Sequence, residues 1–329
     1  MKVLITGGAG YIGSTIASAC EDAGHDVVIL DDFSTGRREF IGERLLYEGD
    51  IADDSLLDRL LREQRIDAVV HCAAKIIVPE SVSEPLAYYE NNVAKTVTLL
   101  AALQRNGVER FLFSSSASIY APDENFVVTE DSPLQPGSPY ARTKFMVELI
   151  LEDFTRASDV RVASLRYFNP IGTDPKLRSG QQLEKPSHVL AKLLEAWVNK
   201  ETFTVTGVDW PTRDGSGIRD FIHVWDLARA HVAALEHFDE ATATDPYQVF
   251  NIGTGNGVTV KELAASFEKI TGDPLKVRFG DPRPGDVAGV YTVSTKARDV
   301  LGWEAELTET DAVRDAIAWL PVRKERLGY

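Results

Sequence analysis

A tyrosine and a lysine that could act together stand four residues apart, at Tyr140 and Lys144, just after a Ser138-Pro139 pair typical of a helix start. Residues at positions i and i+4 share one face of a helix. A phenol has a pKa near ~10, so it is a base at neutral pH only if its phenolate is favoured, as a nearby lysine cation would favour it. The spacing predicts a proton acceptor at Tyr140 tuned by Lys144; the alternative is a pair that only covers a helix surface.

A hydroxyl group is the third candidate for this chemistry. The apolar run 110–113 predicts a strand, and the segment 114–118 that follows it holds four serines. A hydroxyl at the carboxyl end of a parallel strand can relay a proton or hold a substrate hydroxyl, although serines there are also common turn formers. Ser116, Tyr140 and Lys144 would together surround one hydride acceptor.

A dinucleotide-binding pattern lies at the start of the chain. The apolar run 3–5 predicts a buried strand, and Gly7, Gly10 and Gly13 follow it as a helix begins. Gly7 allows a sharp turn, Gly10 lets backbone N–H groups approach a pyrophosphate, and Gly13 lets the helix pack closely on the strand. The next strand ends at Asp31, whose carboxylate would accept both hydroxyls of an adenosine ribose.

This pattern predicts NAD as the cofactor. Because Asp31 would repel a 2′-phosphate, NAD is favoured over NADP; Arg37 and Arg38 are contrary evidence, which we interpret as solvated loop charges. The residues expected around the adenosine and pyrophosphate are Gly7, Gly10, Tyr11, Ile12, Gly13, Asp31, Asp32, Phe33, Ser34, Thr35 and Gly36.

Strand runs at 45–47, 68–72 and 110–113 alternate with helical patterns at about 53–64 and 86–106. Such alternation predicts an α/β fold with a doubly wound parallel Rossmann sheet. We expect an NAD-binding domain over residues 1–170 and a smaller α/β substrate domain over residues 171–329. Segments near 219–253 could return to the first domain.

Further cofactor contacts are expected where the third and fourth strands end. Asp50 and Ile51 stand where an adenine would lie, and Asp50 could instead serve as a helix cap. The fourth strand ends in Cys72, Ala73, Ala74 and Lys75 at the carboxyl edge, where ligands bind in such sheets. Lys75 could reach a phosphate or ribose, or point to water. The segment 121–139 predicts a surface loop across the mouth of the cleft.

The composition disfavours several classes of partner and function. The 35 basic and 50 acidic residues give a net charge of -15, which disfavours nucleic acid and anionic membranes as partners. Cys20 and Cys72 form no CxxC, the histidines form no HExxH, and no apolar run reaches the ~18 residues of a membrane span. We expect a soluble, cytoplasmic enzyme without a metal, and an anionic substrate would need a locally basic pocket.

The chain resembles the extended short-chain dehydrogenase/reductase superfamily and, within it, the UDP-glucose 4-epimerases. The resemblance rests on the glycine loop, on Ser116, Tyr140 and Lys144, and on residues 80–82, 88–93, 114–116, 166–170, 214–224, 251–253 and 283–286. One difference is that these epimerases often carry a lysine at the position of Ile76, one place after Lys75. The resemblance implies the catalytic roles given above, a UDP-hexose substrate, and cofactor contacts from Asn91 and Phe168.

Substrate contacts follow from the same resemblance. The two phosphates of a UDP-sugar need planar, permanently charged donors on an acidic protein, and Arg219 and Arg283 are the candidates. The resemblance adds Asp286 for the uridine ribose, Val290 beside the sugar C2 group, and a contact set of Ser116, Tyr140, Asn169, His188, Val189, Thr204, Val205 and Thr206.

The expected reaction is interconversion of UDP-galactose and UDP-glucose through a 4-keto sugar and enzyme-bound NADH. A 4,6-dehydratase would need an acid pair after Ser116, where Ala117 and Ser118 stand. UDP-N-acetylglucosamine or UDP-glucuronate as the substrate, and a non-catalytic NAD-sensing regulator, remain alternatives. Helices near 86–106 and 140–156 could pair with their copies in a homodimer or be buried in the monomer.

Overall fold

The structure is a computed structural model, which describes residues 1–121, 123–282 and 286–329. Its largest element is a seven-stranded sheet in the order β11-β7-β5-β4-β1-β2-β3, and every neighbouring pair in it is parallel. The strands are β1 (Lys2–Thr6), β2 (Asp26–Asp31), β3 (Leu45–Glu48), β4 (Ala68–His71), β5 (Arg110–Ser114), β7 (Arg161–Tyr167) and β11 (Tyr247–Ile252).

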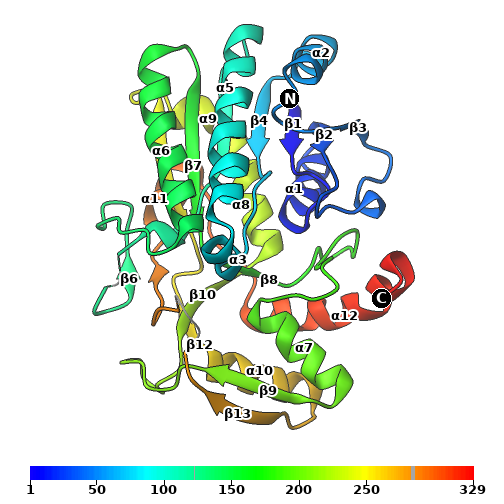
Figure 1. Cartoon of the computed structure of the whole chain (residues 1–329), viewed down its shortest axis with the longest axis vertical. Coiled ribbons are helices and arrows are strands. Elements are labelled where there is room, and N and C mark those ends of the chain that lie inside the picture. Colours follow the sequence, from blue (N-terminus) through cyan, green and yellow to red (C-terminus); the bar gives the residue numbers. More distant parts are fainter. Residues whose placement is uncertain (122, 283–285) are drawn as a thin grey trace.

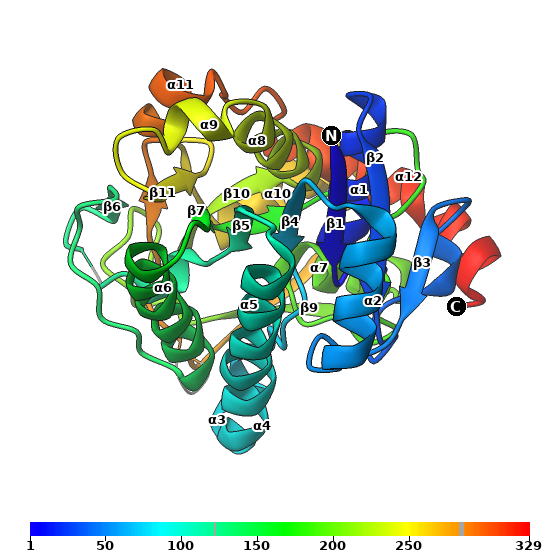
Figure 2. The same ribbon diagram turned by 90° about the horizontal axis from the view of Figure 1, so that it is seen from above.

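Helices cover both faces of this sheet (Figure 2), which is why its central strands are continuous apolar runs. Val3 and Ile5 of β1 pack into one buried cluster and Leu4 into the other. The first cluster includes α1 (Tyr11–Asp22), α8 (Val224–Glu236), α9 (Phe238–Ala241) and α11 (Thr295–Leu301), and the second includes α2 (Asp54–Gln64), α5 (Lys95–Asn106) and α6 (Pro139–Ala157). The predicted doubly wound α/β fold is confirmed.

A smaller region faces the carboxyl ends of the large sheet, in the lower half of Figure 1. It contains a three-stranded sheet in the order β12-β10-β8 and a two-stranded sheet of β13 and β9. A separate core cluster joins residues of β8, β9 and β10 to three helices. The elements are α7 (Val189–Asn199), α10 (Val260–Thr271), α12 (Glu309–Leu327), β8 (Asn169–Ile171), β9 (Thr202–Thr206), β10 (Ile218–His223), β12 (Gly257–Thr259) and β13 (Lys276–Gly280).

Short elements lie between the longer helices and strands. The segment predicted as a surface loop contains β6 (Val127–Val128), which pairs with β14 (Tyr291–Thr292). The remaining turns are α3 (Val78–Ser83), α4 (Pro85–Tyr89), a π-helical turn η2 (Glu90–Ala94), and the 3-10 turns η1 (Arg38–Phe40) and η3 (Ala117–Ile119).

The chain passes from one region to the other more than once. After β10 in the smaller region, α8 packs against α1, and β11 then pairs with β7 at the edge of the large sheet. The assignment of residues 1–170 to NAD and residues 171–329 to the substrate stays a prediction. In the part of the chain that the structure describes, no helix is both long and apolar enough to cross a membrane.

Candidate active site

Tyr140 and Lys144 lie on the buried face of α6 near its start. The helix begins because the hydroxyl of Ser138 accepts a hydrogen bond from the Ala141 N–H at 3.2 Å and Pro139 supplies a suitable φ. Tyr140 is 7% exposed and Lys144 is 3% exposed. This end of the helix therefore holds a phenol and an ammonium below the protein surface.

Ser116 meets Tyr140 from the end of β5. Its hydroxyl oxygen accepts from the Ser118 N–H at 3.2 Å, which fixes the first turn after the strand. Burial raises the pKa of Tyr140, and a hydrogen bond with Ser116 lowers it by less. The structure thus brings together the hydroxyl and the phenol that the sequence predicts as partners.

Lys144 is held one turn further along. Its Nζ donates to the Ser114 carbonyl oxygen at 2.7 Å and lies 4.8 Å from the ring centre of Phe113. Burial lowers the pKa of Lys144 to about 8, and the nearby side chains of Cys72 and Glu148 act against this shift. The expectation that Lys144 lowers the pKa of Tyr140 is not met: that pKa is raised, because removal of the phenol from water is the largest effect on it.

The glycine loop passes very close to the end of β4. Gly7 has φ +71°, and a Cβ atom there would lie 2.7 Å from the Ala73 backbone nitrogen. A Cβ on Gly13 would lie 2.2 Å from the Gly7 carbonyl oxygen. Gly10 is the N-cap of α1 and has no side chain to occupy the helix end, so the first N–H groups can face a pyrophosphate. The close-packed glycine loop and the open N-terminus of α1 therefore fit the pyrophosphate of the predicted NAD.

Asp31 fixes the turn after β2. Its Oδ2 accepts from the Ala9 N–H and its Oδ1 from the Phe33 N–H, both at 2.8 Å. Burial raises the pKa of Asp31, and these two hydrogen bonds lower it by less. Each carboxylate oxygen has a second lone pair, so the group can still accept ribose hydroxyls.

The neighbouring loop residues and arginines are engaged in local contacts. Asp32 accepts from the Ser34 N–H at 2.9 Å. Arg38 pairs with Glu48 at 2.5 Å and lies over the Phe33 ring, which is compatible with a charge used locally rather than for a 2′-phosphate.

Asp50 and Ile51 follow β3 as predicted, and Ile51 is buried. Asp50 accepts from the Ala52 N–H at 2.9 Å and forms an ion pair with Lys95. Asp53, not Asp50, caps α2, so the alternative of a cap at Asp50 is wrong. Lys95 escaped prediction because its partner is 45 positions away. A contact of Asp50 with adenine stays a prediction.

Asn92, which was not among the predicted site residues, links the segment after β4 to helix α6. The Asn92 amide accepts from the Lys75 N–H at 2.8 Å and donates to the Lys75 carbonyl at 2.9 Å. It also donates to the Thr143 hydroxyl at 3.1 Å, which itself donates to the Tyr140 carbonyl. Asn91, the predicted contact, donates to the side chain of Asn92.

Lys75 and Cys72 have protein partners in the structure. Lys75 Nζ lies 3.2 Å from a Glu80 oxygen and 5.8 Å from the Tyr88 ring centre. Cys72 Sγ lies 3.2 Å from the Ser114 hydroxyl, and burial raises its pKa to about 11. Ala74 is partly exposed between them at the carboxyl edge. Contacts of these residues with the cofactor stay predictions.

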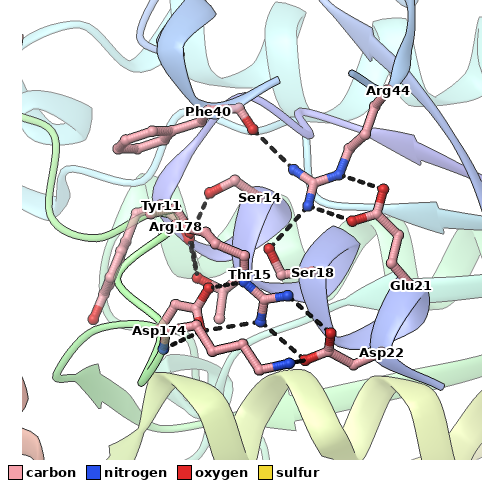
Figure 3. A network of polar contacts seen from close by, with 12 residues as sticks. Tyr11, Ser14, Thr15, Ser18, Glu21, Asp22, Phe40, Arg44, Asp174 and Arg178 are labelled. Atoms are coloured by element: carbon pink, nitrogen blue, oxygen red, sulfur yellow. Dashed lines mark hydrogen bonds and ion pairs between the residues drawn. The ribbon is translucent and has the colours of Figure 1, made fainter. Parts of the chain in front are cut away.

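Tyr11 joins the glycine loop to the smaller region. Its hydroxyl donates to the Gly172 carbonyl at 2.7 Å, and its ring stacks on His188 with the centroids 6.5 Å apart. Beyond Gly172 the chain is anchored to α1 by Arg178, which lies between Asp22 and Asp174 in Figure 3. The predicted pyrophosphate loop and the predicted substrate segment at His188 are therefore in direct contact.

His188 and Val189 begin α7, because Nδ1 of His188 accepts from the Ala191 N–H at 3.4 Å. Burial lowers the pKa of His188 to about 4. The predicted nucleotide strand, Thr204, Val205 and Thr206, is the end of β9, which pairs with β13. Asn169 starts β8 and is exposed.

Arg219 contacts the segment that carries Asp286. Its Nη1 donates to the carbonyl oxygens of Ile218 and Ala288, both at 2.7 Å, and its Nη2 donates to the Val287 carbonyl at 3.1 Å. The guanidinium thus fixes the backbone after Asp286 as well as being a candidate phosphate ligand. The predicted partner Arg283 lies outside the described residues.

Val290 packs on a small cluster that contains Ala117, Tyr120, Val128 and Phe168. Ala117 directly follows Ser116, so this predicted sugar-specificity residue is close to the hydroxyl that the sequence predicts to be catalytic. The ring of the next residue, Tyr291, lies elsewhere: a Cβ added to Gly257 would be 2.5 Å from it.

The fold and this site define an NAD-binding α/β protein with the serine, tyrosine and lysine of a short-chain dehydrogenase/reductase. The chain belongs to the NAD dependent epimerase/dehydratase family, whose model matches residues 3–253. The predicted family and the prediction of NAD as cofactor are confirmed.

Relatives cover nearly the whole chain. A UDP-glucose 4-epimerase of Azospirillum brasilense is 42% identical over 99% of this chain and 94% of its own length. The crystal structure of a UDP-glucose-4-epimerase from Stenotrophomonas maltophila, with bound NAD and formylated UDP-arabinopyranose, has a TM-score of 0.93 and 36% identity over 99% of both chains. That of the Bifidobacterium longum UDP-glucose 4-epimerase in complex with NAD+ and UDP has a TM-score of 0.92 and 34% identity over 100% of both chains.

Proposed function

We propose that this protein is an isomerase that interconverts UDP-galactose and UDP-glucose. The observation that carries the proposal is the meeting of Ser116, Tyr140 and Lys144 at the carboxyl edge of the sheet, where Ala73 also lies against the glycine loop. The relatives named UDP-glucose 4-epimerase support the same reaction.

The three side chains have separate tasks. Tyr140 takes the proton of the sugar 4-hydroxyl, either directly or through Ser116, which lies close enough to lower the pKa of the phenol. Because burial raises the pKa of Tyr140, the phenolate depends on nearby positive charge at the moment of transfer. NAD would supply the hydride acceptor and, in its oxidised form, one such charge. Lys144 uses one N–H for the Ser114 carbonyl and retains two for the nicotinamide ribose.

Inversion at C4 requires that the sugar be held less firmly than the nucleotide. Arg219, with the backbone it orders after Asp286, would hold the uridine diphosphate. The side chains packed around Val290 are those of Ala117, Tyr120, Val128 and Phe168, which would give the hexose a mainly apolar wall. The 4-keto sugar could therefore turn about its phosphate link and take the hydride back on its other face, while Tyr140 returns the proton.

Ala117 and Ser118 decide against the 4,6-dehydratase alternative, since neither can supply the acid and base that loss of the 6-hydroxyl requires. A regulator that only senses NAD would not need the catalytic set. UDP-N-acetylglucosamine remains a substrate to test because Val290 is small, and UDP-glucuronate remains a weaker alternative.

A homodimer is part of the proposal. Val97 of α5, and Met146 and Leu149 of α6, are 46%, 40% and 46% exposed, on helices that cover the same face of the sheet. Apolar side chains on two neighbouring helices could bury one another across a two-fold axis. Sedimentation equilibrium should give twice the monomer mass, and Leu149→Glu should shift the protein toward the monomer.

We also place the protein in the cytoplasm. Cys20 and Cys72 are both free thiols in the structure, as expected under reducing conditions. Recovery of the native protein with membranes or in an extracellular fraction would contradict this location.

The experiment that tests the function mixes the purified protein with UDP-galactose and follows the products by proton NMR. UDP-glucose should form until the two sugars reach equilibrium, with no net NADH, and denaturation should release NAD. Accumulation of a 4-keto-6-deoxy sugar or of stoichiometric NADH would contradict epimerisation. Turnover without any released NAD would contradict the cofactor.

A further inference from the structure

Tyr329 lies against the loop that follows Asp31, far from it in sequence. The Arg37 guanidinium carbon is 5.6 Å from the ring centre of Tyr329, and that of Arg323 is 4.9 Å from the same ring. The hydroxyl of Tyr329 donates to the Gln182 carbonyl oxygen. Gln182 in turn donates from its side chain to the Thr35 carbonyl at 3.3 Å. Tyr329 thus contacts the Asp31 loop both directly and through Gln182.

The same loop is anchored on its other side by the glycine loop. The Arg37 N–H donates to the Ala9 carbonyl at 2.9 Å, and a Cβ on Gly36 would lie 2.7 Å from both Ala9 Cβ and an Asp31 oxygen. Residues 32–37 are therefore held between the pyrophosphate-binding turn and Tyr329. A shift on the Tyr329 side would move the Asp31 carboxylate relative to that turn.

The aromatic ring stabilises two like charges at once. In the described part of the chain, Nε of Arg37 and Nε of Arg323 are buried without a hydrogen-bond partner. Burial lowers the pKa of Arg323, and the charge of Arg37 lowers it further. A ring face next to each guanidinium offsets part of this repulsion through cation–π attraction.

The backbone before Tyr329 is shaped to bring the ring to this place. Helix α12 ends at Leu327, and Gly328 has φ +82°, a left-handed conformation that turns the chain at a helix end. On the same helix, Trp319 donates to the Gln181 carbonyl at 3.1 Å and supports the residue before Gln182.

We propose that Tyr329 is a positioning residue for the cofactor: it holds the adenosine-ribose loop against the glycine loop and so strengthens the binding of NAD. The inference rests on the proposed NAD site. It assigns to Tyr329 no contact with the hexose and no part in proton transfer.

The test compares full-length variants by the dissociation constants of NAD, ADP-ribose and UDP. Tyr329→Leu should weaken NAD and ADP-ribose by the same factor, about five- to 30-fold, because the loop serves the adenosine end, which both ligands share. UDP affinity should not change. Tyr329→Phe keeps the ring and should retain most of the NAD affinity, and Gly328→Ala should resemble Tyr329→Leu.

The matched control is Arg326→Ala. Arg326 lies on the same helix and donates to the Arg178 carbonyl at 2.7 Å, and in the described part of the chain it forms no hydrogen bond or ion pair with the Asp31 loop. Its loss should leave NAD affinity unchanged. A double-mutant cycle of Arg37→Met with Tyr329→Leu should show coupling, since the two side chains act through one contact.

The outcomes separate this inference from the proposed function. If the natural protein binds no NAD, the proposed site is wrong. If it binds NAD and Tyr329→Leu binds it equally well, the positioning role is wrong and the NAD site stands. A loss shared equally by NAD and UDP, or an equal loss in Arg326→Ala, would show a general destabilisation and also overturn the role of Tyr329.

Discussion

The large sheet and the smaller region position their functional groups by different means. In the large sheet, Asp31 ends one buried parallel strand, Ser116 follows another by two residues, and Gly7 is within contact distance of the residues just after β4. In the smaller region, Arg219 is held by carbonyl oxygens of residues 287 and 288, in a segment outside regular helices and strands. The proposed chemistry thus depends on residues held by a rigid sheet, and the proposed substrate site depends on a few hydrogen bonds to a loop. Changes in the two regions should therefore have separable effects.

The largest effect on turnover should come from a substitution at Tyr140. Tyr140→Phe removes the proton acceptor and keeps the ring, so turnover should fall about 100-fold to 10,000-fold while UDP affinity stays unchanged. Tyr47→Phe is the control, because the Tyr47 hydroxyl bonds Glu63 on the outside of the sheet at 2.7 Å. Steady-state rates with UDP-galactose and calorimetry with UDP test the pair. Near-normal turnover in Tyr140→Phe would contradict the assignment.

A change in the smaller region should weaken the binding of UDP and leave the binding of NAD unchanged. Arg219→Ala should weaken UDP binding by roughly 2 to 4 kcal/mol, as when a charged hydrogen-bond partner is lost from a desolvated site. It also removes the donors that fix the carbonyls of Val287 and Ala288. NAD retention should not change, because these contacts are outside the large sheet.

Arg213→Ala is the control for Arg219. Arg213 lies in the same part of the sequence but forms an exposed pair with Glu262, so UDP affinity should stay the same. Calorimetry with UDP gives both values. Equal affinities in the natural protein and in Arg219→Ala would show that the guanidinium serves the loop alone.

The sequence predicts contacts within one helix or turn, but it does not predict contacts between residues that are far apart along the chain. Tyr140 with Lys144, and the glycines before Asp31, are local patterns whose geometry follows from one helix or one turn, and the structure shows each as expected. Asn92 and Lys95 could not be found this way, because their partners are 17 and 45 positions away and depend on how helices pack.

The pKa of a buried side chain was the property that the sequence predicted least well. The spacing of Tyr140 and Lys144 predicts that the lysine lowers the pKa of the phenol, but burial has the larger effect and raises it. Burial depends on the whole fold and leaves no local pattern in the sequence. Tyr329 escaped prediction for a related reason, since its partner Gln182 is 147 positions away.

Acid should destabilise the fold through buried histidines, of which His71 and His231 lie against the large sheet and His188 begins α7 in the smaller region. Burial lowers the pKa of His71 to about 3 and that of His231 to about 4, both from 6.5. The unfolded chain takes up protons below pH 6.5 and the folded chain does not, so stability should fall between pH 6.5 and 4 by about 1.4 kcal/mol per pH unit for each histidine. Asp220 in β10 opposes this, because its raised pKa of about 6 favours the folded state as pH falls from 6 to 3.8.

Urea unfolding at pH 7 and pH 5 measures this slope. The natural protein should lose unfolding free energy between pH 7 and pH 5. In His231→Gln this loss should be smaller by the contribution of the one histidine that was removed. His237→Gln, at an exposed position, should leave the loss unchanged. A loss equal in the natural protein and in His231→Gln would contradict the assignment of acid sensitivity to this side chain.

The smallest expected effect concerns the choice between sugars at the boundary of the two regions. Val290 packs beside Ala117 and Phe168, whereas the Tyr291 ring lies against Gly257, so the valine and not the tyrosine faces the cluster next to Ser116. An acetamido group at C2 needs space that an isopropyl side chain leaves and a phenol would fill. We expect the natural protein to turn over UDP-N-acetylglucosamine, and Val290→Tyr to lower its kcat/KM relative to UDP-glucose by about tenfold. Val293→Tyr, at a position 49% exposed, should leave the ratio unchanged. If the natural protein shows no turnover of the acetylated sugar, or if both variants change the ratio equally, Val290 is not the residue that limits the C2 substituent.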